Sequence, residues 1–287
     1  MNTKPPAQTV LAGLIGHGIQ ASRTPRLHEE EGRAQGLTYT YELLDLQTMN
    51  ADTSALPRLL DETEARGFAG LNITHPCKQA VLPLLDELSV EANAIGAVNT
   101  VVFTNGKRIG HNTDWWGFAE SFKRGLPDVP REKVALLGAG GAGAALAYAA
   151  FQLGVQHLLV YDVSQSRAVQ LATHCNQQLA KDWAEPILRP ESALATANGC
   201  MQATPIGMYG HPGLPISASL LHPNLWVSEV IYTPLETELL RHAKALGCQV
   251  LNGSGMTVFQ AVKTFTLFTG LPANPERMLR HFSTLMP

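Results

Sequence analysis

Residues 136–150 read LLGAGGAGAALAYAA and place Gly138, Gly140 and Gly143 in the spacing GxGxxG. The spacing alone recurs by chance, but here an apolar run of strand type precedes it and an alanine-rich helical segment follows, which predicts a dinucleotide-binding loop. The first glycine permits a tight turn, the second lets a pyrophosphate approach the backbone, and the third lets helix and strand pack closely. Unpaired N–H groups at the helix start would face the phosphate oxygens. We expect the whole loop to bind the cofactor: Gly138, Ala139, Gly140, Gly141, Ala142 and Gly143.

An acidic residue, Asp162, ends the next predicted strand, 24 residues after Gly138. An acid at this place accepts hydrogen bonds from the adenosine ribose. A 2'-phosphate there would meet a like charge, at a cost of about 1 to 4 kcal/mol per unit charge for a separation of ~4 Å. The sequence therefore predicts NAD rather than NADP. Two alternatives stay open: Arg167 would suit a 2'-phosphate, and Asp162 would also suit the cap of a helix beginning near Ser164.

Around this loop, short apolar runs alternate with helix-like segments, which is typical of an α/β protein. Before residue 114 we expect strands at 9–16, 38–46 and 68–74, and two more within 97–112 joined by Asn105-Gly106, a two-residue hairpin signal. Thr24 and Pro25 predict the N-cap and first turn of a helix that Gly36 ends.

The second block begins with a predicted helix from Asp114 to Gly125, followed by a linker at 126–133. After the glycine loop we expect further strands at 155–162, 199–204, 226–232 and 248–252. The stretch from Met256 predicts two helices and no strand, so it must pack on an existing sheet, and we expect that of the first block. The expected fold class is thus α/β, with an N-terminal α/β domain (1–113 with 256–287) and a doubly wound, Rossmann-type nucleotide-binding domain (114–255).

The composition limits the classes of function. The 287 residues are 45% apolar and 16% charged, with a formal charge of −3 and no long block of one sign. This disfavours nonspecific binding to nucleic acid or an anionic membrane and favours a small uncharged or acidic substrate. The four scattered cysteines form no CxxC or Cys/His cluster, so we expect no disulfide framework, no metal site and a cytoplasmic location. The apolar stretch near the N-terminus is too short to span a bilayer and predicts a buried strand rather than a signal peptide.

A lysine, Lys78, follows the segment GLNITHPC (70–77), at the start of a helix that Pro76 is expected to open. A cation in a first turn is disfavoured by the helix dipole. Lys78 either reaches solvent or has a function. Asp114 begins the helix at 114–125, where it would also serve as a plain N-cap. A carboxylate beside the lysine would hold the ammonium and share its proton, as acid–base work on a substrate hydroxyl requires.

The chain resembles the shikimate/quinate dehydrogenase family. The resemblance rests on motifs that span nearly the whole chain in family order: ASRTP (21–25), GLNITHPCK (70–78), IGAVNTV (95–101), GHNTDWWGF (110–118), LLGAGGAG (136–143), ATPIGM (203–208) and GMTVFQA (255–261). It implies a substrate domain and a nucleotide domain, and reversible hydride transfer between nicotinamide and C3 of a cyclohexene or cyclohexane carboxylate polyol, shikimate or quinate.

The resemblance also implies roles for individual residues. Lys78 and Asp114 match the catalytic pair. Ser22 and Thr24 match the hydroxyls that hold the substrate carboxylate, and the ring hydroxyls and the rest of the substrate pocket fall to Asn72, Thr74, Asn99, Tyr232 and Gln260. The cofactor set adds Thr204, Gly253 and Met256 to the loop, Asp162 and Arg167. Fixed polar groups suit this substrate, because unpaired buried polar groups are costly and reject the wrong stereoisomer.

Three positions depart from the usual family pattern. Thr24 stands where many relatives have serine, Gln202 where asparagine is usual, and Asn252 where aspartate is usual. NADP-using relatives commonly have an Asn-Arg-Thr type of stretch where this chain has YDVSQSR (161–167), and this difference favours NAD. The sequence gives no account of Gln202 or Asn252.

Two rival functions remain open: a methylenetetrahydrofolate dehydrogenase-like enzyme of the same architecture, and a sensor that binds NAD and a ring acid without chemistry. Relatives occur as monomers and homodimers, and the sequence favours neither state. It also does not separate shikimate from quinate, since one methyl group at Thr24 is worth only ~1 to 3 kcal/mol.

Overall fold

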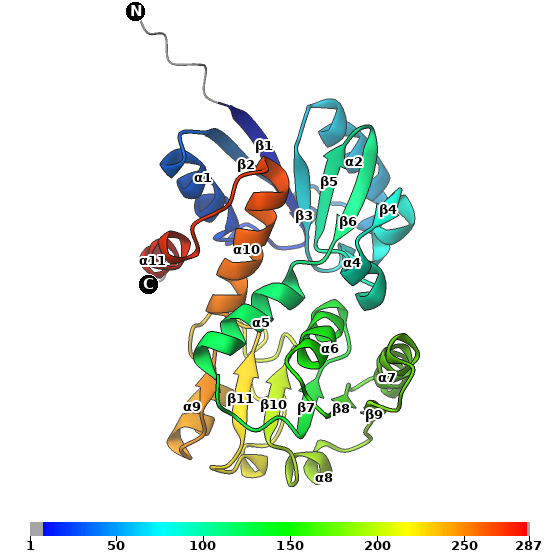
Figure 1. The fold of residues 1–287 in the computed structure, drawn as a ribbon, viewed down its shortest axis with the longest axis vertical. Helices are drawn as coiled ribbons and strands as arrows, with labels where there is room; N and C mark the ends of the chain where they lie inside the picture. The colour runs from blue at the N-terminus through cyan, green and yellow to red at the C-terminus, as the bar shows by residue number, and fades with distance from the viewer. Residues whose placement is uncertain (1–7, 286–287) are drawn as a thin grey trace, which may run out of the picture. The chain divides into compact units, whose positions relative to one another are not determined.

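A computed structural model of the chain describes residues 8–285. It divides into two compact units: one runs to Thr113 and resumes at Gln260, and the other is Asp114–Phe259. Each unit is built on a six-stranded sheet with helices packed on it (Figure 1). The chain passes from one unit to the other at Thr113 and again within helix α10 (Ser254–Thr269). The α/β fold class is confirmed.

The sheet of the first unit is mixed, with the strand order β2-β1-β3-β5-β6-β4. Strand β1 pairs in parallel with β2 and β3, while β5 runs antiparallel to β3 and β6. The strands are β1 (Thr9–Gly16), β2 (Thr38–Asp45), β3 (Gly70–Ile73), β4 (Glu87–Leu88), β5 (Thr100–Thr104) and β6 (Lys107–His111). The predicted hairpin is confirmed: Asn105 and Gly106 join β5 to β6 with φ of 51° and 70°, the left-handed pair that a two-residue turn requires.

Alternation along β1 gives this sheet two apolar faces. Val10, Ala12 and Leu14 pack in one core cluster with Phe265 and Phe268 of α10. Ile15 belongs to the opposite cluster, with the leucines of α2. The helices of the unit are α1 (Thr24–Ala34), α2 (Leu56–Ala65), α3 (Cys77–Ala80), α4 (Val90–Ile95), the second part of α10, and α11 (Pro275–Leu285). The expectation that the last helices pack on the first block is thus met by these contacts.

Two helix starts differ from the sequence prediction. Arg23, not Thr24, is the N-cap of α1, and Thr24 is its first helical residue; the Ser22 hydroxyl accepts from Thr24 N at 3.3 Å. Pro76 takes the N-cap position of α3 instead of its first turn. Because α3 is only four residues long, it has almost no macrodipole, and Lys78 is therefore not placed against a helix dipole as predicted.

The sheet of the second unit is entirely parallel, in the order β12-β11-β10-β7-β8-β9. This is the doubly wound order, and its reversal point lies between β7 and β10. The strands are β7 (Lys133–Leu137), β8 (His157–Tyr161), β9 (Ala184–Pro186), β10 (Gly199–Gln202), β11 (Trp226–Glu229) and β12 (Val250–Leu251). Its helices are α5 (Asp114–Gly125), α6 (Gly141–Gln152), α7 (Gln165–Leu179), α8 (Pro190–Leu194), α9 (Glu238–Ala245) and the start of α10. In Figure 1, α5 and α6 lie side by side on this sheet.

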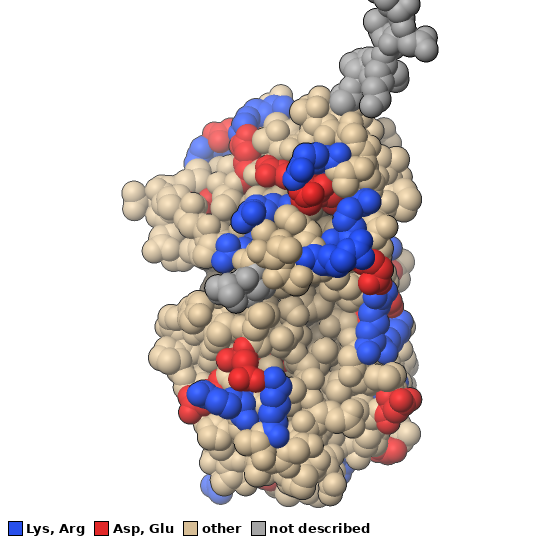
Figure 2. Space-filling model, turned by 90° about the vertical axis from the view of Figure 1, so that its left-hand side faces the viewer, with Lys and Arg blue, Asp and Glu red and all other residues tan. Residues whose placement is uncertain are grey.

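Charged side chains of both signs lie interspersed on the face shown in Figure 2. Elsewhere in the structure, charged side chains form ion pairs, such as Arg108 with Asp61 and Glu64 at 2.6 and 2.8 Å. Between residues 8 and 285, the structure has no helix of the length and apolarity needed to cross a membrane.

A buried histidine makes the first unit sensitive to acid. His28 is fully buried among aromatic rings, and its Nδ1 lies 3.0 Å from the Tyr39 hydroxyl. Burial lowers the pKa of His28 from its ordinary 6.5 to about 3, against the opposing charge of Glu31. The unfolded chain therefore binds a proton below pH 6.5 that the folded chain does not take up until pH falls to about 3, so stability present above pH 6.5 is lost as the pH drops through this window.

We expect the free energy of unfolding to fall by about 2 kcal/mol between pH 7 and about pH 5 through this one group. His28→Leu should remove that part of the pH dependence, measured by urea unfolding at both pH values. His242→Gln, which changes a half-exposed histidine, is the control. An unchanged slope in His28→Leu would contradict the assignment.

Candidate active site

The glycine loop has the geometry that a dinucleotide requires. Gly138 has a φ of +97°, and its N–H donates to Tyr161 O at 2.7 Å. A Cβ on Gly143 would lie 2.0 Å from Gly138 O, so only glycine lets α6 pack this closely. A Cβ on Gly140 would meet nothing within 4 Å, so the space over that residue is open. Helix α6 starts without a capping side chain, leaving its first N–H groups for a phosphate.

The carboxylate of Asp162 is bound to this loop. It follows β8, and its Oδ2 accepts from Ala139 N at 2.8 Å while its Oδ1 accepts from Ser164 N at 2.8 Å. A carboxylate offers about four acceptor positions, so about two remain for ribose hydroxyls. The N-cap of α7 is Ser164, so Asp162 supports the turn before the helix without being its cap. Arg167 lies exposed in the first turn of α7.

Thr204 lies against the same loop, at the reversal point of the sheet. A Cβ on Gly138 would be 3.0 Å from Thr204 Cγ2. The segment is shaped by Gln202, which is fully buried at the end of β10: its Nε2 donates to Ile206 O at 3.0 Å and its Oε1 accepts from Thr204 N. The structure therefore explains Gln202, which the sequence did not: the oxygen and the nitrogen of its side-chain amide both bind the backbone of the turn that contains Thr204.

Asn252 has a similar role before α10. Its Oδ1 accepts from Ser254 N at 3.1 Å and from Ser254 Oγ at 2.6 Å, and its Nδ2 donates to Leu235 O at 3.1 Å. The last bond needs an amide, which aspartate would not provide. Next to it, a Cβ on Gly253 would be 2.1 Å from Val230 O, so this turn tolerates only glycine. Met256, one turn into α10, is buried, and Tyr232 is half-buried shortly after β11.

In the first unit, the predicted substrate residues follow the carboxyl ends of β1 and β3. Ser22 and Thr24 come after β1, and Thr74 and Lys78 come after β3, each of these side chains half-buried except the buried Thr24. Gly16 is confined by Thr74, since a Cβ there would lie 2.3 Å from Thr74 Cγ2. Parallel neighbours β1 and β3 therefore bring these four residues to one edge of the sheet.

Two residues that the sequence analysis missed shape this edge. Asp45, at the end of β2, accepts from Gly18 N and Ile19 N at 2.8 and 3.1 Å and so holds the loop that leads to Ser22. Burial would raise the pKa of Asp45, but hydrogen bonds from Gln20 and from the backbone outweigh it and hold that pKa below its ordinary value. An acid at the end of a predicted parallel strand was the available signal. The second residue is Thr113, which follows β6 and forms hydrogen bonds with Asn99.

Asn99 and Asn72 are buried, and their side-chain amides are hydrogen-bonded to protein groups. Asn99 Oδ1 accepts from Thr113 N at 2.7 Å, and Asn99 Nδ2 donates to Thr113 Oγ1 at 2.9 Å. Asn72 Oδ1 accepts from the Tyr41 hydroxyl at 2.8 Å, while its Nδ2 donates to Asn99 O and Thr100 Oγ1 at 3.2 and 3.1 Å. Both amides are thus engaged within the unit.

The remaining predicted site residues are divided between the two units. Lys78 and Gln260 belong to the first unit, whereas Asp114, buried as the first residue of α5, begins the second. Lys78 O accepts from Val98 N at 2.9 Å, which ties α3 to the segment that carries Asn99. Cys77, beside Lys78, is a buried thiol whose pKa is raised to about 11 by burial, which makes it a poor nucleophile.

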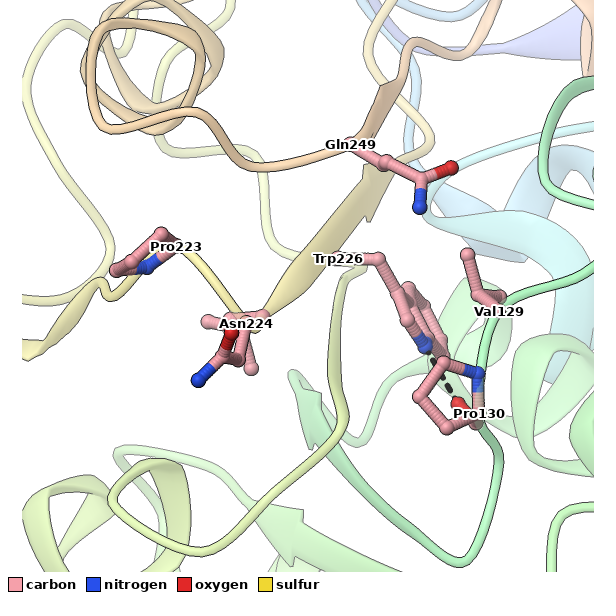
Figure 3. Close-up of a pocket in the computed structure, with 7 residues that line it drawn as sticks. Val129, Pro130, Pro223, Asn224, Trp226 and Gln249 are labelled. Carbon is pink, nitrogen blue, oxygen red and sulfur yellow. Dashed lines mark hydrogen bonds between the residues drawn. The ribbon is translucent and has the colours of Figure 1, made fainter.

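A small hollow in the second unit lies at the wrong end of the sheet for the cofactor. It is lined by residues that precede β7, β11 and β12, among them Pro130, Asn224 and Gln249, and Trp226 Nε1 donates to Pro130 O at 2.8 Å (Figure 3). The nucleotide edge is the opposite one, where the strands have their carboxyl ends.

The fold and the loop define a two-unit α/β protein with a dinucleotide-binding domain. The family described as "Shikimate dehydrogenase substrate binding domain" matches residues 14–101. A shikimate dehydrogenase (NADP(+)) of Streptomyces avermitilis is 51% identical over 96% of this chain and 95% of its own length. A quinate/shikimate dehydrogenase (NAD(+)) of Corynebacterium efficiens is 48% identical over 96% of this chain and 99% of its own.

Solved structures agree with the sequence comparison. Quinate dehydrogenase from Corynebacterium glutamicum in complex with NAD superimposes with a TM-score of 0.90 at 46% identity, over 96% of this chain and 99% of that one. The chain belongs to the shikimate/quinate dehydrogenase family, as its motifs indicated.

Proposed function

We propose that the protein catalyses the NAD-dependent, reversible oxidation of the C3 hydroxyl of shikimate and of quinate. The choice of NAD as the cofactor rests on the Asp162 carboxylate, which accepts hydrogen bonds from Ala139 N in the glycine loop and from Ser164 N. Its free acceptor positions suit the two ribose hydroxyls of NAD, and its charge opposes the 2'-phosphate of NADP.

Relatives of similar identity are named for different cofactors: the 51% identical one for NADP and the 48% identical one for NAD. Overall identity therefore does not choose between them, and the local chemistry at Asp162 supports NAD. Arg167, exposed in the first turn of α7, is a neighbouring residue whose charge would favour NADP.

On the substrate side, we propose that Ser22 and Thr24 bind the ring carboxylate and that Thr74, Asn99, Gln260 and Tyr232 meet the hydroxyls. Short polar side chains at one sheet edge fix each hydroxyl only if their own positions are fixed. Asp45 and Thr113 provide that rigidity for the Ser22 loop and for Asn99.

Bound NAD supplies the hydride acceptor. Lys78 Nζ takes the proton from the C3 hydroxyl during oxidation and returns it during reduction, and the Asp114 carboxylate orients the amine and stabilises its charged form. A single amine serves both directions, because acid–base roles reverse with the reaction.

The test of this function is a set of four kcat/KM values, for shikimate and quinate, each with NAD and NADP, from initial rates of reduced-cofactor formation. We expect turnover of both acids and higher values with NAD. Turnover of methylenetetrahydrofolate in place of either acid would support the rival enzyme, and NAD binding without turnover of any of these substrates would support a sensor.

The cofactor preference should depend on Asp162. In Asp162→Asn, one carbonyl oxygen remains to bind the loop but the charge is gone, so the ratio of kcat/KM for NAD to that for NADP should fall about fivefold or more, the effect of about 1 kcal/mol or more of relieved repulsion. Asp182→Asn, an exposed acid in the same unit, should leave the ratio unchanged. An unaltered ratio in Asp162→Asn would show that another group selects the cofactor.

A further inference from the structure

Five polar side chains form a buried cluster in the first unit, which we name the Thr264 cluster. Its members come from β3, from β5 and the residue before it, from the residue before α5, and from α10: Asn72, Asn99, Thr100, Thr113 and Thr264. Thr264 and Thr100 have no exposed surface, and the other three are at most 4% exposed. Polar groups buried this completely are retained only with hydrogen-bond partners.

Thr264 lies at the centre of this cluster. Its hydroxyl oxygen is 3.2 Å from Thr113 Oγ1, 3.3 Å from Thr100 Oγ1 and 3.4 Å from Asn72 Nδ2. It is the one member from α10, a helix whose neighbouring side chains Phe265 and Phe268 are apolar and packed in the core. A lone hydroxyl on that apolar face needs a reason, since a valine of the same shape would bury more cheaply.

The hydrogens of the cluster can be placed consistently. Thr100 Oγ1 donates to Asn99 Oδ1 at 3.1 Å and accepts from Asn72 Nδ2 at 3.1 Å. Asn99 Nδ2 donates to Thr113 Oγ1 at 2.9 Å. The two hydrogens of Asn72 Nδ2 go to Asn99 O and Thr100 Oγ1, so the Thr264 hydroxyl accepts from Thr113 Oγ1 and donates to Thr100 Oγ1. Removal of the Thr264 hydroxyl therefore takes one hydrogen-bond partner each from Thr113 and Thr100 and weakens the constraint on their orientation.

This chain of bonds ends at the backbone before Asp114. Thr113 N donates to Asn99 Oδ1 at 2.7 Å, and Asp114 is the next residue. We propose that Thr264 is a positioning residue: through Thr113 and Asn99 it fixes the start of α5 and hence the Asp114 carboxylate. This inference rests on the proposed function of Asp114.

Asn72 takes a positioning role in the same way. Its Oδ1 accepts from Tyr41, whose ring lies 5.0 Å from that of buried His28, and both of its N–H donors face oxygens of the cluster. No donor is left for a ring hydroxyl. Asn72 thus holds Asn99 and Thr100, and a substrate hydroxyl would have to donate to the second lone pair of its Oδ1.

The test compares Thr264→Val, which keeps the shape of the side chain and loses the hydroxyl, with Thr264→Ser, which keeps the hydroxyl. We expect kcat for shikimate to fall about tenfold or more in Thr264→Val with the KM for NAD changed less than about twofold, because a small misplacement of a catalytic group lowers the rate of the chemical step. Thr264→Ser should recover most of kcat. Thermal unfolding of both variants reports whether stability changes in parallel.

Thr266→Val is the matched control, because Thr266 lies on the same helix and its hydroxyl donates only to Val262 O of that helix at 3.2 Å. In an Asp114→Asn background, Thr264→Val should lower kcat no further, since the two changes act on one group. Equal kcat in Thr264→Val and Thr266→Val, with an active wild type, would overturn this inference and leave the proposed function intact. An inactive wild type would overturn both.

Discussion

Lys78→Ala is expected to lower kcat for shikimate oxidation by about 10²- to 10⁴-fold, the contribution of a positioned acid–base group. In the proposed reaction, the amine receives the proton of the substrate hydroxyl as the hydride leaves, so its removal should slow that step. The side chain of Lys78 is half-buried, and its backbone carbonyl accepts a hydrogen bond from Val98 N. The substitution removes the amine and leaves this backbone hydrogen bond in place. Initial rates at saturating NAD give the comparison.

The control for this variant is Lys123→Ala, which removes an exposed lysine that pairs with Glu120 on α5. Its kcat should match that of the wild type, and the affinity of both variants for NAD should be unchanged, as measured by quenching of intrinsic fluorescence. Normal turnover by Lys78→Ala would refute the role assigned to the amine.

Two glycine substitutions in the cofactor loop should have large but different effects. Gly143→Ala places a methyl group 2.0 Å from Gly138 O, so α6 must move away from the loop. We expect it to lower both the thermal midpoint and the affinity for NAD, by about tenfold or more for the latter. Calorimetry and an NAD titration measure the two effects.

Gly140→Ala tests the same loop without disturbing the fold. Gly140 has a φ of −84°, which alanine adopts readily, and the added methyl group meets no protein atom within 4 Å. The thermal midpoint should therefore stay near that of the wild type, while NAD affinity falls because the methyl group occupies the space over which the pyrophosphate approaches. If Gly140→Ala bound NAD as the wild type does, the loop would not hold the phosphates.

Local signals with a strict backbone requirement predicted their structures well. The glycine loop and the Asn105-Gly106 turn are examples, because each needs glycine at a positive φ or at a close approach. Helix α5 also matches its prediction at both ends. The strands at 68–74 and 226–232 are shorter than expected, at Gly70–Ile73 and Trp226–Glu229, because pairing ends before the apolar pattern does.

Features that depend on tertiary contacts were not accessible from the sequence. The two-residue strand β4 and the three-residue strand β9 exist only by pairing with β6 and β8. Gln202 and Asn252 became intelligible only once their backbone partners were known. Thr264 gave no signal at all, since a threonine in an apolar helix has no pattern that distinguishes it.

The most direct measurement of the central claim follows a single atom. Shikimate deuterated at C3 is oxidised by the wild-type protein with NAD, and the reduced nicotinamide is examined by mass spectrometry. We expect the deuterium on the nicotinamide ring and a slower chemical step with the deuterated substrate. Reduced cofactor that carries no deuterium, or no reduced cofactor with either acid, would contradict hydride transfer from this carbon.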